Sequence, residues 1–412
     1  MACPKEPGTP ELHGPWATGY PSGAPAPPSR VAPEAAAISS GHANLPEPEI
    51  AFDLTPLQNA HRYRGIVTYV RGLAVRLMQQ KDVPIEFWGW DGEPSFVIEP
   101  PHRKLLLTRI PMPRYRGAWL FAQLATRRRA MKSRVKAVHV TDPEALTALP
   151  RRKLLATVYD LIPLKQGIGR RRALARAGYD SYLKGLRKAD VLFAISEQTA
   201  GDIVEMLRVP ASRIRIAKPG VDLPRSEPRT VRRARQYFLY LGGPNPNKNL
   251  GVLLDAMAQC TELEEELRIG GYWLPKQVAA LEAQTSSAEL RGRVRHIGFV
   301  PEEELTALIR DATAVIIPSL QEGFGLPVAE GLAAGALVIH SRLPVLEATS
   351  GGAALVFDPT SATALADCLR RAAHDPELQK SLRGRALEQA RQITWDAAIK
   401  TTLTTYEAIL RE

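Results

Sequence analysis

Short apolar runs recur along the chain from about residue 49 onward, and amphipathic stretches with helical spacing separate them. Apolar runs of this length, bounded by turn residues, are typical of strands that are buried on both faces. Strands that alternate with helices predict a parallel, doubly wound sheet. The pattern therefore predicts an α/β fold. The expected strands are residues 49–54, 84–88, 104–107, 137–140, 154–158, 191–195, 214–217, 237–241, 267–270, 294–297, 314–317, 337–340 and 354–357.

The strands fall into two series, which predict two Rossmann-like domains. A Pro- and Arg-rich stretch, residues 222–235, separates the series and is expected to be a linker. Residues 1–48 hold 11 of the 34 prolines, so they bury too little apolar surface to offset the entropy of ordering and are predicted to be disordered. The expected organisation is a tail at 1–48, domains at 49–224 and 225–394, and a final helix at 395–412.

Composition narrows the class of protein. The chain has 412 residues, 45% hydrophobic and 24% charged, which indicates a globular protein. No apolar run approaches the ~18 residues of a membrane span, and the first residues lack the apolar core of a secretion signal. The three cysteines are scattered without metal-ligand spacing. A cytoplasmic, reduced protein is expected.

The net charge of +11 is concentrated in one region. Residues 101–190 contain 22 Lys/Arg against 5 Asp/Glu, partly in the runs 127–129, 151–153 and 170–172. Three interpretations remain open, namely a nucleic-acid surface, an anionic membrane or lipid-phosphate surface, or solvated helix faces. Nothing nearby resembles a nucleic-acid-binding motif. We therefore expect peripheral contact with an anionic membrane and no nucleic-acid partner.

Residues 318–331, PSLQEGFGLPVAEG, carry the most specific chemistry. A buried strand at 314–317 is expected before them, and a helix over 326–334 with Pro327 in its first turn. The glycine turn between them leaves backbone N–H groups free at a helix N-terminus, where an anion binds. Glu322 and Glu330 flank this position, and a carboxylate beside a phosphate is useful when it binds hydroxyl groups. The motif predicts a nucleotide-sugar site.

This motif resembles the Glu-x₇-Glu signature of the retaining family 4 glycosyltransferases. The resemblance implies the GT-B fold, in which two Rossmann-like domains face a cleft and a C-terminal helix crosses back to the first domain. It also implies that the first domain takes the acceptor and the second the nucleotide sugar, with Glu322 on the donor sugar and Glu330 on the ribose.

Further positions match the same family. Lys248 follows a glycine-rich turn at a helix start, and the resemblance implies that it binds the donor diphosphate. Relatives often carry an arginine where this chain has Gly243 or Asn247, so the second cation is missing from those places. Residues 296–301 resemble the strand end whose backbone receives the base. The expected donor-binding residues are Gly243, Asn247, Lys248, Gly298, Phe299, Val300, Glu322, Gly323, Phe324, Gly325, Leu326 and Glu330.

Candidate acceptor-side residues lie in the first domain. Arg64 and Gly65 resemble the glycine loop of the family. Tyr159 and Asp160 lie in a segment where many relatives have His-Asp-Leu-x-Pro, with Tyr159 in place of the histidine. A phenol with a pKa near ~10 is a poor base at neutral pH. Retaining transferases need no strong base, because the departing phosphate can take the proton, so Asp160 is the better polar candidate, with a structural cap as its alternative.

The sequence thus predicts a retaining hexosyltransferase with Lys248 and Glu322 as catalytic residues. GDP-mannose is the first donor hypothesis, because the motifs resemble bacterial polysaccharide mannosyltransferases, and a UDP-hexose is the second. The expected acceptor is a glycan or a lipid-diphosphate-linked glycan at the inner face of the membrane. No Asp-x-Asp motif occurs, so neither a metal nor another cofactor is expected. A non-catalytic nucleotide-sugar-binding protein is the alternative from another class.

Overall fold

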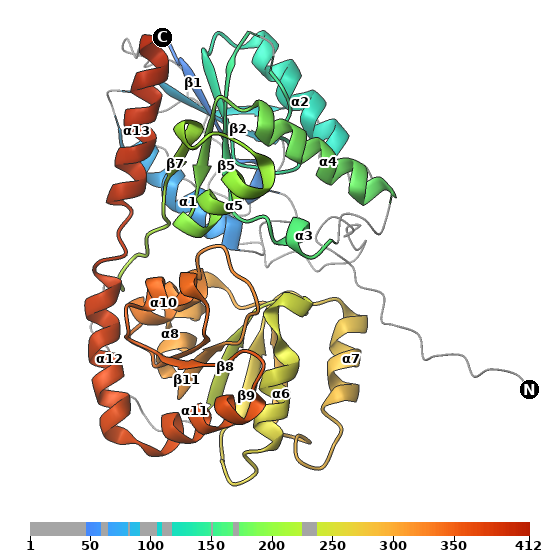
Figure 1. The fold of residues 1–412 in the computed structure, drawn as a ribbon, viewed down its shortest axis with the longest axis vertical. Helices are drawn as coiled ribbons and strands as arrows, with labels where there is room; N and C mark the ends of the chain where they lie inside the picture. Colours follow the sequence, from blue (N-terminus) through green and yellow to red (C-terminus); the bar gives the residue numbers. More distant parts are fainter. Residues whose placement is uncertain are drawn as a thin grey trace, which may run out of the picture.

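The structure, a computed structural model, describes residues 47–58, 65–80, 83–90, 105–108, 118–149, 151–167, 173–224 and 237–412. Figure 1 shows two lobes, each built around its own sheet. The expected α/β fold with two doubly wound domains is confirmed. The predicted disorder of the tail, candidate Arg64, the basic run 170–172 and most of the predicted linker lie outside the described residues.

The first sheet has seven strands in the order β3-β2-β1-β4-β5-β6-β7, and every neighbouring pair is parallel. Its register sets Phe52 of β1 opposite Phe87 of β2 and His139 of β4. The chain changes its direction of growth between β1 and β4, which is where open α/β sheets bind ligands. The strands are β1 (Ile50–Asp53), β2 (Ile85–Trp90), β3 (Leu105–Thr108), β4 (Ala137–Val140), β5 (Lys153–Val158), β6 (Val191–Ala194) and β7 (Ile214–Ile216).

The second sheet has six parallel strands in the order β10-β9-β8-β11-β12-β13. Its corresponding change of direction lies between β8 and β11, so the loops after these two strands meet at one edge of the sheet. Those loops contain Lys248 and Glu322. The strands are β8 (Tyr237–Leu241), β9 (Glu266–Gly270), β10 (Val294–Gly298), β11 (Ala314–Ile317), β12 (Val338–Ser341) and β13 (Leu355–Phe357).

Helices connect consecutive strands in both domains. The described helices are α1 (Gly65–Met78), α2 (Ala118–Lys132), α3 (Ile162–Lys165), α4 (Ala173–Lys188), α5 (Glu197–Leu207), α6 (Leu250–Ala258), α7 (Pro275–Gln284), α8 (Glu302–Asp311), α9 (Leu326–Ala333), α10 (Pro344–Ser350), α11 (Ala362–His374), α12 (Pro376–Ala390) and α13 (Asp396–Arg411). A serine directly before a helix, such as Ser196, is expected to cap it. Ser196 does cap α5, by accepting the Thr199 amide at 3.0 Å. Helix α2 was not predicted, because apolar residues on its exposed face, such as Leu120 and Leu124, obscure the amphipathic pattern.

The C-terminal helices join the two domains. Helix α12 lies along the second domain and α13 along the first (Figure 1). Helix α13 buries Ala398, Tyr406 and Ile409 in the core of the first domain. The Tyr406 hydroxyl lies 2.7 Å from Nδ1 of the buried His139 on β4. The expected crossing of this helix back to the first domain is therefore confirmed, with α13 beginning one residue after Trp395.

Trp395 fixes the crossing point because the backbone of the first domain approaches its ring closely. Its side chain is buried, and a Cβ atom added at Gly72 of α1 would lie only 2.1 Å from its Cζ2 atom. A Cβ atom at Gly220 would lie 2.3 Å from its backbone nitrogen. Arg76 stacks its guanidinium on the indole, 5.1 Å from the ring centroid. Two glycines thus permit the contact by which α13 docks.

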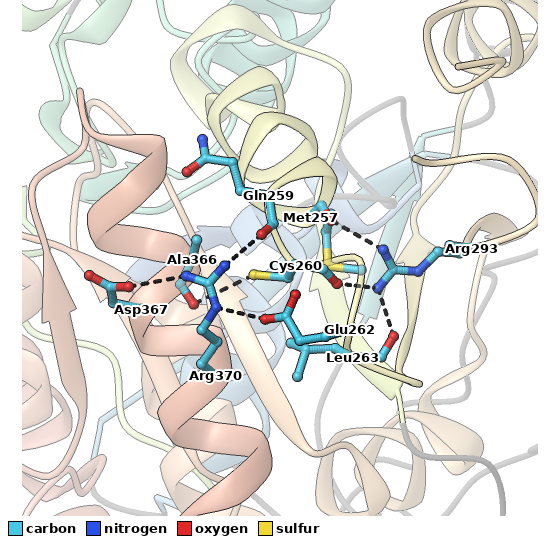
Figure 2. A network of polar contacts seen from close by, with 9 residues as sticks. All are labelled: Met257, Gln259, Cys260, Glu262, Leu263, Arg293, Ala366, Asp367 and Arg370. Atoms are coloured by element: carbon cyan, nitrogen blue, oxygen red, sulfur yellow. Dashed lines mark hydrogen bonds and ion pairs between the residues drawn. The ribbon is translucent and has the colours of Figure 1, made fainter. Parts of the chain in front are cut away.

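Two arginines fix the far end of α6, the helix that follows the Lys248 loop (Figure 2). Arg293 donates to the carbonyl oxygens of Cys260 and Leu263 at 2.9 and 3.0 Å. Arg370 of α11 donates to Glu262 at 2.7 Å. Arg293 also donates to the Met257 carbonyl oxygen at 3.2 Å, in the last turn of α6, where carbonyl groups lack partners within the helix. The network holds α6 against α11 and thereby fixes the direction of its N-terminus.

Replacing Gly72 with alanine should destabilise the protein, because the added methyl group meets a buried indole that cannot move away. Overpacking of this kind costs about 1–3 kcal/mol. Gly384→Ala on α12 is the matched control, since a Cβ there contacts nothing within 4 Å. It should be neutral or stabilising by up to ~1 kcal/mol. Urea unfolding measures both, and equal stability of the two variants would contradict the docking role of Trp395.

Candidate active site

The turn between β11 and α9 depends on one glycine. Gly325 has φ +95°, in the left-handed region, and a Cβ there would lie 2.5 Å from Cδ2 of Leu346. Glycine is the residue that tolerates both conditions. Leu326 then begins α9 with Pro327 in its first turn, where the missing proline N–H is harmless. The expected sequence of strand, glycine turn and helix is observed.

Lys248 and Glu322, the two predicted catalytic residues, are in direct contact. Nζ of Lys248 donates to Oε1 of Glu322 at 2.7 Å, and the Ser319 hydroxyl donates to the same oxygen at 2.6 Å. The Glu322 side chain is 10% exposed and that of Lys248 25%. The pair is partly desolvated, so its charges interact more strongly than an exposed ion pair. The sequence did not single out Ser319, although it lies three residues before Glu322.

Backbone contacts hold the two loops together. The Leu320 amide donates to the Asn247 carbonyl oxygen at 2.7 Å. The Tyr240 hydroxyl donates to the Gly243 carbonyl oxygen at 2.9 Å, and burial together with the charge of Glu322 raises the pKa of this tyrosine. Asn247 and Gly243 therefore contribute carbonyl groups that position the Lys248 loop.

Backbone N–H groups lie at the start of α9. Among the described residues, none is seen to accept a hydrogen bond from the amides of Gly323, Phe324, Gly325 or Leu326. The dipole of α9 adds positive potential at the same end. An anion at this position would find amide donors beside the ammonium group of Lys248.

Glu330, the fifth residue of α9, has a different environment from Glu322. Its carboxyl group is partly buried, and burial raises its pKa to about 7. The nearby charge of Glu302 acts in the same direction, whereas that of Arg71 opposes it. Arg71 of α1 forms a two-point ion pair with Glu302 of α8, which links the two domains. Glu330 thus changes protonation state near neutral pH.

The turn also contacts the first domain. The Ser196 hydroxyl donates to the Gly323 carbonyl oxygen at 2.6 Å. A Cβ at Gly323 would lie 2.3 Å from the Tyr159 carbonyl oxygen, so a side chain there would push the domains apart. Ser196 was expected only as a helix cap. No local pattern reveals its second contact, because the partner is 127 residues away.

Two hydrophobic contacts accompany these hydrogen bonds. The Phe324 side chain is buried in the same cluster as Tyr159 and Trp395 of the interdomain region. A Cβ at Gly65 would lie 3.2 Å from Cδ1 of Leu326. The Phe324 ring is thus packed between the domains, and its backbone amide is the part of the residue that is expected at the donor site.

The acceptor-side candidates differ in accessibility. Tyr159 is buried, and its hydroxyl donates to the Thr141 carbonyl oxygen at 3.0 Å, which contradicts a direct side-chain role at the acceptor. Burial raises its pKa well above the ordinary value. Asp160 is partly exposed and accepts the Ile162 amide at 3.0 Å at the start of α3, the structural cap named as its alternative. Gly65 is the first residue of α1 and lies beside Leu326.

The segment expected to receive the base ends β10. Gly298 has φ +77°, and its carbonyl oxygen accepts the Gly271 amide at 2.8 Å. Phe299 is exposed and lines a pocket with Val300 and residues of α8. This pocket extends along α8 to Tyr237, at the start of β8, so it leads away from the edge that carries Lys248.

Within the described part of the chain, no three or more His, Cys, Asp or Glu side chains are grouped as metal ligands. Cys260 and Cys368 are buried free thiols whose pKa burial raises. None of the described helices is long and apolar enough to cross a membrane.

Two sequence families match consecutive parts of the chain. Residues 63–225 match the family described as Glycosyltransferase Family 4. Residues 226–389 match the family described as Glycosyl transferases group 1. The junction of the two matches falls between the first and second sheets.

Curated relatives are about 25–32% identical to this chain over the aligned residues. An O-antigen chain mannosyltransferase B of Escherichia coli is 27% identical over 241 residues, 55% of this chain and 62% of the relative. A D-inositol 3-phosphate glycosyltransferase of Nocardioides sp. is 32% identical over 244 residues, 53% of each chain. The matches thus span less than two thirds of these relatives.

Solved structures share the fold across nearly the whole chain. A sucrose-phosphate synthase from Thermosynechococcus elongatus has a TM-score of 0.72 at 20% identity, covering 89% of this chain and 100% of that one. A protein of Anabaena solved with UDP and glucose has a TM-score of 0.68 at 16% identity, covering 88% and 100%. At such identities the likeness shows the two-domain GT-B fold alone.

Proposed function

Because the chain belongs to the family 4 glycosyltransferases, we propose that it transfers a hexose from a nucleoside diphosphate to a glycan or lipid-linked acceptor. Retention of the anomeric configuration accords with this family. The observation that supports the proposal most directly is the contact between Lys248 and Glu322 at the edge of the second sheet. That contact places a cation, a carboxylate and the amides that begin α9 around one position.

The leaving group of this reaction is a nucleoside diphosphate, so its departure develops negative charge. Groups fixed in advance around that charge lower the barrier most. Lys248 would exchange its contact with Glu322 for the diphosphate oxygens, while the amides of Gly323 to Leu326 donate to the same group. The departing phosphate would take the acceptor proton, which removes the need for a protein base such as the buried Tyr159.

The two glutamates have separate proposed roles. Glu322, relieved of Lys248 when a donor is bound, would accept hydrogen bonds from the sugar hydroxyls near the reacting carbon. Glu330 would accept them from the ribose hydroxyls. Their different surroundings support this division. Glu322 is paired with Lys248, whereas Glu330 is partly buried and lies near the carboxylate of Glu302. Gly298 to Val300 would present backbone groups to the base.

GDP-mannose is the first proposed donor. The E. coli relatives are named as an O-antigen chain mannosyltransferase and a serotype-specific mannosyltransferase, the latter 25% identical over 262 residues. A UDP-hexose is the second, supported by the structural neighbour solved with UDP-glucose. A panel of nucleoside diphosphates and their sugars in a thermal-shift assay separates the two hypotheses.

The acceptor is proposed to be a growing polysaccharide or a glycan on a lipid diphosphate. The basic residues between 101 and 190 would hold the enzyme at an anionic membrane, at the cytoplasmic face where such lipids are used. Arg129 and Arg152 are already engaged with backbone carbonyl oxygens, so the remaining exposed cations would make this contact. Proposed partners are therefore the donor, the acceptor and the membrane surface.

Removing the charge of Lys248 should weaken nucleoside diphosphate binding by about tenfold to a hundredfold, the worth of a charge-assisted hydrogen bond. Calorimetry with the free diphosphate measures the effect of Lys248→Ala. Lys380→Ala on α12, an exposed lysine outside the site, is the control and should bind as the wild type does. Unchanged affinity in Lys248→Ala would remove Lys248 from the site.

The two glutamate variants should differ in kinetics. Glu330→Gln should raise the donor KM about tenfold with a smaller loss of kcat, because the ribose contact exists in ground and transition states alike. Glu322→Gln should instead lower kcat, by about a hundredfold. Glu303→Gln, at an exposed position of α8, serves as the control. Wild-type kinetics in both site variants would mean that the signature is structural here.

Donor affinity should depend on the ionisation of Glu330. Only the carboxylate form can accept hydrogen bonds through both oxygens, and burial raises its pKa to about 7. Affinity should therefore fall as pH drops below that value, by several-fold per pH unit. The dependence should be absent in Glu330→Gln. A profile that is identical in both proteins would assign the titration to another group.

Activity is proposed to need no metal, since Lys248 and the helix amides supply positive charge at the diphosphate. Excess EDTA should leave turnover unchanged in a donor-consumption assay. Complete loss of activity, restored by added Mg²⁺ or Mn²⁺, would replace this mechanism with a metal-dependent one.

A further inference from the structure

Helix α2 presents apolar side chains to solvent. Of the ten exposed large hydrophobic residues in the described part of the chain, four lie on this helix, whereas the others are spread over different elements. Leu120 and Leu124 are 47% and 55% exposed, and Met131 is 60% exposed. Phe121 lies next to them at 43%. The helical period puts residues 120, 124 and 131 on one face, so α2 carries an apolar stripe directed away from the core.

Basic side chains surround this stripe. Helix α4 packs beside α2 through a hydrogen bond of 3.0 Å between Gln123 and Ser181, and Figure 1 shows the two helices next to each other. The exposed basic residues of the two helices are Arg127, Arg128, Lys132, Arg176, Lys184, Arg187 and Lys188. The one acidic residue in either helix, Asp180, lies 3.6 Å from Arg176. These exposed residues of both helices are called the α2–α4 surface below.

The last arginine of the run 127–129 does not belong to this surface. Arg129 donates to the Gly89 carbonyl oxygen and stacks 5.7 Å from the Trp88 ring centroid. It therefore anchors α2 to the first sheet. Arg127 and Arg128 remain exposed between Leu124 and Met131 along α2, so the run serves two separate purposes.

We propose that the α2–α4 surface docks on an anionic lipid bilayer, with Leu120, Leu124 and Met131 entering the headgroup region. This inference rests on the membrane contact proposed above and identifies the element that makes it. Basic side chains around an apolar helix face bind anionic lipids by attraction and then by burial of the apolar residues. The two contributions differ in their response to salt.

A bilayer explains both features of the surface. A nucleic acid would engage the cations but leave Leu120, Leu124 and Met131 in water. A second copy of this chain would bring seven further cations against the same seven, since a symmetric contact apposes identical surfaces. Anionic headgroups above a hydrocarbon layer complement the charge and the apolar stripe at once.

Vesicle sedimentation tests the proposal with phosphatidylcholine alone and with added phosphatidylglycerol. The wild type should bind the anionic vesicles. Leu120→Ser combined with Leu124→Ser should reduce binding by about tenfold at low and high salt alike. Arg127→Gln combined with Arg128→Gln should reduce it at low salt, with a smaller effect where salt already screens the charges. Val204→Ser on α5, 40% exposed and remote in sequence, is the control and should bind as the wild type.

A fluorescence measurement identifies insertion directly. Leu124→Trp should gain a blue-shifted emission component on anionic vesicles relative to the wild type, and lipids brominated near the headgroup should quench it. Equal vesicle binding by the Leu120/Leu124 double variant and the wild type would overturn the proposal. So would equal wild-type binding to neutral vesicles, binding to neither kind, or a dimer in sedimentation velocity that the double variant loses.

Nucleoside diphosphate binding, measured by calorimetry on the same double variant, separates this proposal from the proposed enzyme activity. It should be unchanged, since the substituted residues lie outside the donor site. Vesicle binding without any diphosphate binding would leave the membrane surface intact and reject the glycosyltransferase function.

Discussion

The turn between β11 and α9 is fixed from both domains, and the geometry of the site depends on this double restraint. On one side the Ser196 hydroxyl binds the Gly323 carbonyl oxygen, and Phe324 is buried between the domains. On the other side the Leu320 amide binds the Asn247 carbonyl oxygen. The turn cannot shift without breaking contacts to one domain. Its amides and Glu322 are therefore held in place before any ligand arrives, which is the condition for electrostatic stabilisation without reorganisation.

Close backbone approach makes this restraint possible. Gly323 lets the turn reach the Tyr159 carbonyl oxygen, and Gly72 lets Trp395 dock against α1. The first contact joins the two domains and the second joins the C-terminal helix to the first domain, so glycines determine how near these parts come. The ion pair of Arg71 with Glu302 spans the same interface, but both side chains are partly exposed, and such pairs contribute little stability. Shape, more than surface charge, sets the domain arrangement.

Much of this arrangement could be predicted from sequence. Apolar runs gave the strands, because a strand buried on both faces leaves a continuous local signal. The glycine turn before α9 followed from spacing, whereas the contact of Lys248 with Glu322 was not predicted, because the family resemblance implied only that both residues bind the donor. The interdomain contacts of Ser196 and Arg71 and the burial of Phe324 were not predicted either, since each depends on a partner far away in the chain. The sequence placed Tyr159 directly after a strand, as observed. It could not show that the Tyr159 hydroxyl donates to the Thr141 carbonyl oxygen, which keeps the side chain inside the first domain.

The charge distribution differs between the places of the two proposed binding tasks, namely the donor and the membrane surface. The net charge is +11, yet residues 101–190 alone have 22 basic against 5 acidic residues, so the other residues together are net negative. Residues 225–394 contain 19 Lys/Arg against 20 Asp/Glu, so the second domain has no net positive charge with which to attract an anionic donor. The proposed function would require it to hold the diphosphate with local groups, namely Lys248 and the dipole at the start of α9. These act at hydrogen-bond distance in a partly desolvated site, where salt screens little, whereas the exposed arginines of α2 and α4 act on a distant surface through solvent. Under the two proposals, one chain would bind a small anion by fixed geometry in one domain and a large anionic surface by long-range attraction in the other.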